Sequence, residues 1–141
     1  PLDGFGFVVP RSEGRPILAC TFSSIKYPGR APEGFVLLRL FLGGALNEGI
    51  LQEDDAKLLA LSRSQLADLL GVTAVPTLSR VHRFPASMAQ YHLGHLDRVA
   101  AIERRVAKQS GLALAGSGYR GVGIADCIRS GEDAAERVLA S

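Results

Sequence analysis

The sequence predicts an α+β fold, in which a mainly antiparallel sheet with helices precedes a C-terminal strand, a glycine-rich turn and a last helix. Apolar runs of strand length, separated by loops rich in proline and glycine, occupy residues 5–42. Two later stretches carry apolar residues at helical spacing. The series Gly116-x-Gly118-x-x-Gly121 then separates a short apolar run from an amphipathic helix. With 141 residues, of which 47% are hydrophobic and 21% charged, the chain has the size and composition of a globular domain.

Four strands are expected in the first part of the chain, over residues 5–9, 16–24, 35–42 and 77–84. Short loops join the first three, which predicts an antiparallel meander. The run 35–42 is almost wholly apolar, as is typical of a strand that is covered on both faces. Arg39 interrupts this run, so it needs a partner if it is buried, or a position at an edge of the sheet if it is not.

Three helices are expected. Residues 53–70 carry leucines along one stripe and acidic residues in the first turn, where the helix dipole favours negative charge. Gly71 is a residue type that commonly ends a helix. A second helix is expected at 96–108, followed by a short strand at 112–115, and the third helix runs from Ile124 almost to the last residue. Small residues on the third helix would let it pack closely against a neighbouring sheet.

The distribution of charged residues and the positions of the cysteines and histidines argue against several kinds of site. A net charge of +2, with Lys and Arg scattered along the chain, does not indicate a nucleic-acid partner. No apolar run is long enough to span a bilayer. Cys20 and Cys127 form no C-x-x-C pair, and the three histidines have no further ligand at zinc spacing, so neither a disulfide nor a metal is expected. No Ser-His-Asp or paired-carboxylate arrangement suggests a catalytic side chain.

The glycine-rich turn is the strongest candidate site. A strand, a turn with few side chains and a helix N-terminus together present unpaired N–H groups and a partial positive charge to a ligand. The spacing matches the dinucleotide-binding fingerprint in form, but that motif needs a second strand and an acidic residue about 20 positions further on. The chain stops after the helix, so a self-contained dinucleotide site is not expected. Either the turn contacts a ligand that other parts of a larger protein hold, or it is a tight turn for helix packing.

Four segments carry a resemblance to one family. Residues 115–128 (AGSGYRGVGIADCI) resemble the C-terminal flavin-contacting motif of the protoporphyrinogen oxidases, which are FAD-dependent, amine-oxidase-like flavoproteins. Residues 4–10 (GFGFVVP), 41–44 (FLGG) and 90–95 (QYHLGH) are similar to three further segments of that family. The segments occur in family order along nearly the whole chain. The coproporphyrinogen III oxidase branch shares them.

The resemblance implies an FAD-dependent oxidoreductase that acts on CH–CH groups of a porphyrinogen with oxygen as acceptor. Both protoporphyrinogen IX and coproporphyrinogen III are compatible substrates. Family members are longer and carry their FAD-binding βαβ unit nearer the N-terminus. The chain is therefore expected to be an inactive C-terminal part, whose partner is the missing N-terminal FAD-binding part of the same protein. On this basis residues 1–108 are assigned to a substrate-binding domain and residues 109–141 to the end of the FAD-binding domain.

The resemblance also implies which residues lie at each site. The residues expected to contact FAD are Gly116, Val122, Gly123, Ile124 and Phe84. The residues expected to contact the porphyrinogen are Gly6, Val8 and Phe41. The positive end of the last helix would favour an anionic form of the flavin. An alternative interpretation stays open for Phe84 and for the porphyrinogen set, because all of them are also compatible with core positions at or in strands.

Two other functions stay open. Another amine-oxidase-like flavoprotein, acting on an amine or a carotenoid, would share the general fold. A non-catalytic binding domain would retain the fold without the chemistry. A cytoplasmic location is expected, and both a homodimer and a peripheral attachment to the inner face of a membrane are left open.

Overall fold

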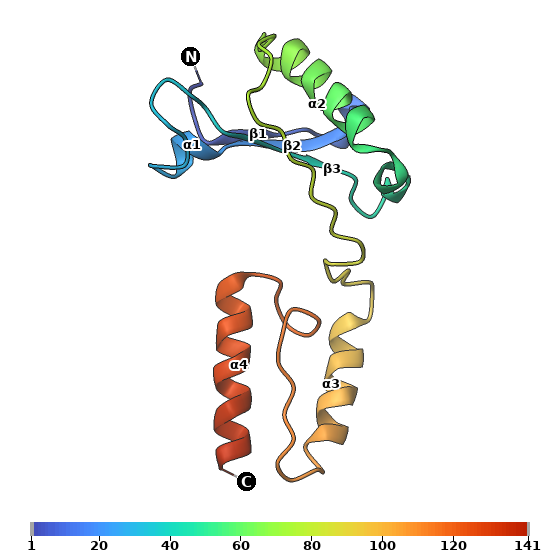
Figure 1. The fold of residues 1–141 in the computed structure, drawn as a ribbon. Helices are drawn as coiled ribbons and strands as arrows, with labels where there is room; N and C mark the ends of the chain where they lie inside the picture. Colours follow the sequence, from blue (N-terminus) through green and yellow to red (C-terminus); the bar gives the residue numbers. More distant parts are fainter. Residues whose placement is uncertain (1, 141) are drawn as a thin grey trace. The chain divides into compact units, whose positions relative to one another are not determined.

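The computed structural model describes residues 2–140 and divides between Arg83 and Phe84 into two compact units. The N-terminal unit contains a sheet with helices, and the C-terminal unit contains two long helices (Figure 1). This division falls earlier in the chain than the boundary predicted between residues 108 and 109. The assignment of the two parts to substrate and FAD stays a prediction.

A three-stranded antiparallel sheet forms the centre of the N-terminal unit. Its strands β1 (Gly6–Val8), β2 (Ile17–Phe22) and β3 (Leu38–Leu42) lie in the order β1-β2-β3. The short 3-10 turn η1 (Arg11–Glu13) joins β1 to β2, and the short helix α1 (Ser23–Lys26) follows β2. The predicted antiparallel meander is confirmed. However, β3 is an edge strand of the described sheet, because no further strand among residues 2–140 pairs with it.

The sheet has one covered face and one open face. Burial alternates along β3, where Leu40 is half-buried while Arg39 and Phe41 are exposed. Helix α2 (Asp55–Leu70), which the 3-10 turn η2 (Glu48–Gln52) precedes, lies over one face of the sheet (Figure 1). The buried apolar side chains of this unit are Ile17, Cys20, Phe22 and Leu58.

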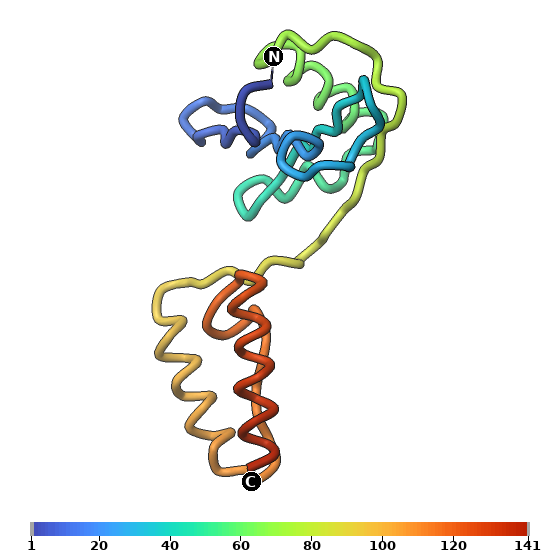
Figure 2. The backbone as a smooth tube through the Cα atoms, turned by 90° about the vertical axis from the view of Figure 1, so that its left-hand side faces the viewer, coloured from blue at the N-terminus to red at the C-terminus, as the bar shows by residue number. Residues whose placement is uncertain are grey.

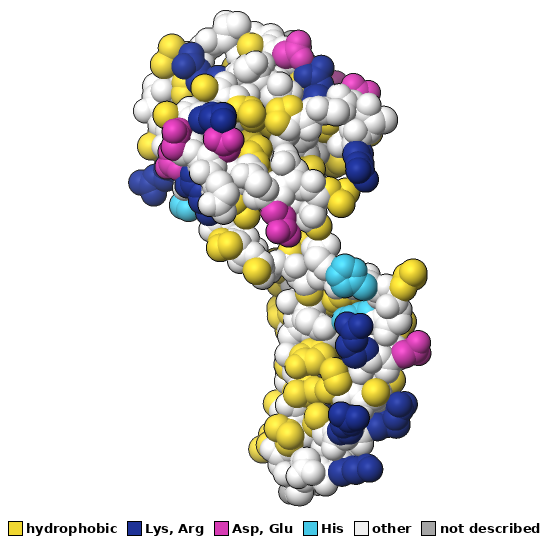
Figure 3. All heavy atoms as spheres, turned by 90° about the vertical axis from the view of Figure 1, so that its right-hand side faces the viewer, with side chains coloured by type: hydrophobic (Ala, Val, Ile, Leu, Met, Phe, Trp, Pro, Cys, Tyr) yellow, Lys and Arg dark blue, Asp and Glu magenta, His cyan; other side chains and the backbone are white. Residues whose placement is uncertain are grey.

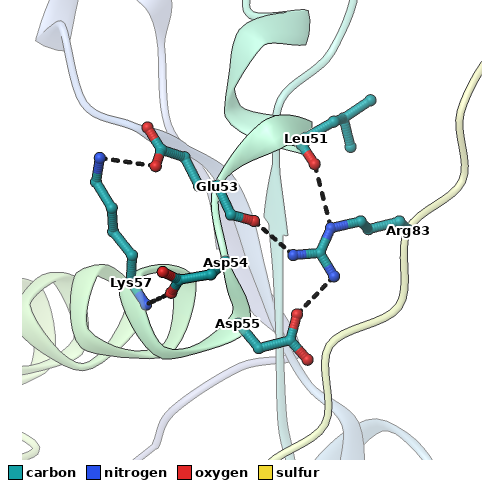
Figure 4. Close-up of polar contacts among 6 residues, drawn as sticks. All are labelled: Leu51, Glu53, Asp54, Asp55, Lys57 and Arg83. Atoms are coloured by element: carbon teal, nitrogen blue, oxygen red, sulfur yellow. Dashed lines mark hydrogen bonds and ion pairs between the residues drawn. The ribbon is translucent and has the colours of Figure 1, made fainter.

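Local capping explains the ends of α2. The side chain of Asp54 accepts a hydrogen bond from the N–H of Lys57 at 2.7 Å, which satisfies one of the unpaired donors of the first turn (Figure 4). Gly71 follows the last turn in a left-handed conformation and donates its N–H to the carbonyl oxygen of Ala67 at 3.0 Å. Gly71 therefore ends this helix, as its residue type predicts.

Residues 72–83 follow α2 without forming a strand, so the fourth strand predicted at 77–84 is wrong. A strand requires a neighbour that exchanges backbone hydrogen bonds, and none in the described part of the chain pairs with this segment. Arg83 instead anchors its end. The guanidinium donates to the backbone oxygens of Leu51 and Glu53 at 3.2 and 2.6 Å and forms an ion pair with Asp55 at 2.5 Å (Figure 4).

The C-terminal unit consists of helix α3 (His95–Val106), helix α4 (Ile124–Leu139) and the chain between them. Figures 1 and 2 show this connecting segment running alongside both helices. The strand predicted at 112–115 is wrong for this structure, since these residues have no strand partner among residues 2–140. Within residues 84–140, Val99 of α3 is the one side chain that is fully buried.

Helix α4 exposes its apolar face. None of its described residues is buried, and Ile124, Ile128 and Leu139 are 82%, 58% and 87% exposed. An amphipathic helix normally buries such a stripe against a neighbour, and the described chain supplies none here. Hydrophobic side chains also reach the surface of the N-terminal unit (Figure 3). Over residues 2–140, no helix combines the length and the hydropathy that crossing a bilayer requires.

Candidate functional site

Most of the residues expected to contact FAD lie together in the turn that precedes α4. Gly116 opens the turn with a φ of +114°, a conformation that favours glycine. Gly123 is the N-cap of α4, and Val122 and Ile124 on either side of it have exposed side chains. The structure therefore places Val122, Gly123 and Ile124 at the entry of the chain into α4, while Gly116 lies next to Ser130, further along the same helix.

The first turn of α4 offers backbone donors. The N–H of Cys127 donates to the carbonyl oxygen of Gly123 at 3.0 Å and so begins the helical hydrogen bonds. The N–H groups of Ile124, Ala125 and Asp126 consequently have no acceptor within the helix. Gly123 has no side chain that would cap them. These donors suit a ligand that presents hydrogen-bond acceptors.

Asp126 changes the electrostatics expected of this helix end. Its carboxyl group lies against the backbone of the turn, because a Cβ on Gly121 would stand 2.6 Å from it and a Cβ on Gly123 would stand 2.9 Å from its Oδ2. A carboxylate in the first turn offsets the positive end of the helix dipole. The positive charge expected from the sequence is therefore reduced, and directional N–H donors are the main feature that remains.

Neither backbone conformation nor a close neighbour in the described chain requires glycine at position 118. Its φ lies outside the positive range, and a Cβ would meet no atom within 4 Å. A Cβ on Gly116 would also point into open space. A close neighbour from outside these residues would explain why no side chain stands at position 118. The segment thus combines N–H donors at the start of α4 with open space next to the backbone at Gly116 and Gly118.

Tyr91, shortly before α3, and His95, the first residue of α3, both donate hydrogen bonds to the turn. The hydroxyl of Tyr91 donates to the carbonyl oxygen of Ser117 at 2.7 Å. Nε2 of His95 donates to the carbonyl oxygen of Tyr119 at 2.6 Å. Sequence reasoning gave Tyr91 and His95 no role, although both belong to the QYHLGH segment that carries part of the family resemblance.

Two further contacts fix the same turn. The N–H of Gly116 donates to Oγ of Ser130 on α4 at 3.0 Å. Arg120 donates to both carboxylate oxygens of Glu103 on α3, with Nε 2.8 Å from Oε1. The hydrogen bond from Arg120, helped by its charge, holds the pKa of the Glu103 carboxyl below its ordinary value, and the pair raises the pKa of Arg120.

Phe84 lies in the same unit as the turn but outside any strand. Its side chain is 70% exposed, so the alternative that it ends a core strand does not hold for the described chain. The hydroxyl of Ser87 donates to its carbonyl oxygen at 2.9 Å. The ring is accessible to a partner, and its contact with flavin stays a prediction.

The residues expected to contact substrate share the open face of the N-terminal sheet. Val8 and Phe41 both stand opposite Ala19 of β2, and Gly6 lies two residues before Val8. Residues opposite each other on neighbouring strands point to the same face, as do residues two apart on one strand. Val8 is 78% and Phe41 is 43% exposed. Within the described residues this set therefore does not face the core, and its contact with substrate stays a prediction.

Gly6 has a structural role of its own on that face. Its φ is +139°, and a Cβ would lie 2.1 Å from the backbone oxygen of Cys20. The close approach of β1 to β2 thus requires glycine whether or not a substrate binds. Arg39 stands opposite Thr21 on the same face and is exposed on the edge strand, so it needs no buried partner.

Metal binding finds no support in the geometry. No three His, Cys, Asp or Glu side chains between residues 2 and 140 are grouped to hold an ion. His95 uses Nε2 for Tyr119. Cys20 is buried in the sheet, and this burial raises the pKa of its thiol to about 11.

Comparisons with known proteins agree with these features. Residues 1–139 match the family described as flavin containing amine oxidoreductase. The chain is 36% identical over 140 residues to the coproporphyrinogen III oxidase of Staphylococcus aureus, covering 98% of this chain and 30% of that protein. It is 34% identical over 141 residues to the chloroplastic protoporphyrinogen oxidase of Oryza sativa, covering 97% of this chain and 26% of that protein.

A solved structure agrees as well. A crystal structure from Exiguobacterium, described as a candidate protoporphyrinogen oxidase, matches with a TM-score of 0.81 at 34% identity, over 94% of this chain and 30% of that chain. The chain spans between 25% and 30% of the length of the relatives that it matches. The resemblance first seen in the four motif segments is confirmed. The chain belongs to the family of flavin containing amine oxidoreductases.

Proposed function

We propose that this chain forms the C-terminal part of an FAD-dependent oxidase that converts a porphyrinogen to the porphyrin, with oxygen as acceptor. The observation that carries the proposal is the segment before α4, where the first N–H groups of the helix have no acceptor within the helix and where a Cβ on Gly116 or Gly118 would point into open space. Family membership supports a flavin cofactor. The relatives that are coproporphyrinogen III and protoporphyrinogen oxidases support a porphyrinogen as substrate.

In this proposal the turn orients the cofactor. The flavin supplies the redox chemistry when it is bound. The backbone around Val122, Gly123 and Ile124 would donate hydrogen bonds to its acceptor atoms, and Gly116 would let the chain pass close to it. The exposed ring of Phe84 would add an apolar contact and keep water away.

The open face of the N-terminal sheet would bind the porphyrinogen. A porphyrinogen is a large, mainly apolar ring that carries carboxylate side chains. Val8 and Phe41 offer apolar contact, and Gly6 leaves room beside them. Arg39 on the same face offers a guanidinium for a carboxylate. No side chain here is assigned an acid–base role, which agrees with redox chemistry that the cofactor performs.

The apolar face of α4 would pack against the FAD-binding remainder of the same protein. The relatives are more than three times as long as the matched region, since that region is at most 30% of their length. Ile124, Ile128 and Leu139 need such a cover, because exposed apolar stripes are unfavourable in water. The isolated chain is accordingly expected to lack activity.

The test is an absorbance spectrum and a porphyrin-fluorescence assay on the full-length protein that contains this chain, with protoporphyrinogen IX and coproporphyrinogen III side by side. Bound flavin with oxygen-dependent growth of porphyrin fluorescence is expected, and the faster substrate identifies the branch. Bound flavin without oxidation of either compound would indicate another amine-oxidase-like flavoprotein. A protein without flavin would leave a binding domain of this fold and reduce the turn to a packing feature.

A matched pair of variants tests the turn itself. Gly118→Val adds a side chain to the segment that is proposed to face the cofactor and is expected to lower the FAD content of the purified protein. Gly49→Val is the control, because Gly49 in η2 also has an ordinary φ and no neighbour within 4 Å of a Cβ. Equal flavin content in the two variants would count against the placement of the cofactor at the turn.

A further inference from the structure

Tyr91 and His95 form a rigid pair of rings beside the turn. Their ring centroids are 4.0 Å apart and the planes differ by 8°, so the rings are stacked. Gly94 lies between them in the chain with a φ of +77° and begins α3 as its N-cap. The N–H of His95 donates to the carbonyl oxygen of His92 at 3.0 Å and closes this bend. The bend thus places two aromatic donors next to each other.

Each ring holds one carbonyl group of the turn. The Tyr91 hydroxyl donates to the oxygen of Ser117 and the His95 imidazole to that of Tyr119. A carbonyl oxygen only accepts, so His95 carries a proton on Nε2. The two bonded carbonyls belong to alternate peptide groups of the same glycine-rich segment.

These two bonds orient the peptide planes. The C=O and N–H of a planar trans peptide point in opposite directions. With the oxygens of Ser117 and Tyr119 held toward the rings, the N–H groups of Gly118 and Arg120 point away from them. The pair therefore determines on which side of the turn the N–H groups of Gly118 and Arg120 lie.

Between Gly116, which is bonded to Ser130, and Arg120, which is paired with Glu103, the turn has little else to fix its conformation. Gly118 carries no side chain, and a Cβ on either Gly116 or Gly118 would meet no neighbour. The bond of the turn's own backbone, from the N–H of Tyr119 to the oxygen of Gly116, is long at 3.4 Å. Glycine-containing backbone without such restraint populates many conformations. Contacts from outside the turn are therefore needed to hold it.

We infer that Tyr91 and His95 are positioning residues for the cofactor: they act through the peptide planes of the turn and not by touching the reacting atoms. The inference rests on the proposed function of the turn as a flavin contact. It gives the QYHLGH segment a physical role, in which Tyr91 and His95 supply the two donors and Gly94 supplies the bend.

The experiment uses the full-length protein loaded with FAD. Tyr91→Phe and His95→Phe, singly and together, keep two rings that can stack and remove only the donors. Each lost hydrogen bond is expected to accelerate FAD loss roughly fivefold, in line with the net contribution of one such bond. The flavin that stays bound is expected to show a shifted absorption maximum and reduction potential, because the donors around it have moved.

The readouts separate positioning from simple stability. A purely structural role would lower the unfolding temperature and leave the spectrum and potential of the retained flavin unchanged. His92→Phe and Tyr27→Phe are matched controls, because the side chain of His92 is exposed and Tyr27 lies in the N-terminal unit. Both controls are expected to match the wild type in spectrum and potential.

Each outcome decides a different claim. A shift in spectrum, potential and FAD retention in the double variant, absent from the controls, supports the positioning role. A wild-type protein that binds flavin, together with a double variant that matches the controls, overturns the positioning role and leaves the proposed function intact. A wild-type protein that binds no flavin overturns both.

Discussion

Replacement of Gly6 by alanine is expected to separate β1 from β2. The structure places a Cβ at this position 2.1 Å from the backbone oxygen of Cys20, whereas real Cβ atoms essentially never lie within 3.0 Å. The strands must therefore move apart by at least the difference, 0.9 Å. The backbone oxygen belongs to the neighbouring strand and cannot rotate away as a side chain would.

The expected loss of folding free energy has two parts in addition to backbone strain. Forcing extra volume into a packed contact costs about 1–3 kcal/mol. Moving β1 also weakens flanking backbone bonds, such as Val9 N–H to Leu18 O at 2.8 Å and Phe22 N–H to Phe5 O at 2.9 Å, each worth about 1 kcal/mol net. The sum is about 3–5 kcal/mol, which corresponds to roughly a hundredfold to a few thousandfold faster exchange of the amides between these strands.

Gly4→Ala is the matched control. Gly4 also has a strongly positive φ, +118°, but a Cβ there would meet nothing within 4 Å, so alanine carries the strain without the clash. Hydrogen–deuterium exchange of peptides covering residues 5–22 in the full-length protein measures both variants. The contact argument is refuted if Gly6→Ala raises exchange in β1 and β2 no more than Gly4→Ala does.

Three further predictions concern side chains with defined partners. Arg83→Met removes an ion pair and two hydrogen bonds to backbone oxygens. Because these groups are partly exposed, the variant is expected to lose about 1–2 kcal/mol of folding free energy and to show faster hydrogen exchange over residues 72–83. Unchanged exchange over these residues would contradict the anchoring role of Arg83. Because burial raises the pKa of the Cys20 thiol to about 11, iodoacetamide at pH 8 is expected to label the half-exposed Cys127 first, and equal labelling by mass spectrometry would count against this. The pKa of Glu103 is lowered by Arg120, so the stability that the pair contributes is present above the ordinary carboxyl pKa of 4.5 and is lost as the pH falls through the lowered value. The unfolding temperature of Glu103→Gln is therefore expected to lie below that of the wild type at pH 7 and to approach it in acid, and a difference that grows in acid would reverse the sign of this argument.

Elements whose causes are local were predictable from the sequence. The acidic first turn and Gly71 bounded α2 because capping bonds reach only three or four residues along the chain. The meander was predictable because short loops leave few alternatives for β1, β2 and β3. The position of Val122, Gly123 and Ile124 at the start of α4 followed from a continuous motif.

Elements that depend on a distant partner were not predictable in the same way. The run 77–84 has strand-like composition, but a strand forms only where another edge pairs with it, and the sheet of this unit ends at β3. The same holds for 112–115 beside α3 and α4. The bonds from Tyr91 and His95 reach acceptors 26 and 24 residues away, a distance at which local patterns carry no information. Their inclusion in a family motif was the only signal for them in the sequence.

The glycines show why motif spacing cannot assign function by itself. Gly6 and Gly118 both lie in segments that resemble the family, yet they are glycines for different reasons. Gly6 is required by a neighbouring strand of this chain, so its substitution reports on stability before it reports on substrate. Gly118 has an ordinary φ and no neighbour within 4 Å of a Cβ, so the described chain has room for a Cβ there and a loss of FAD on substitution would point to a partner that the turn contacts. A variant at position 118 is therefore the sharper probe of the cofactor, although the two glycines are equally prominent in the sequence.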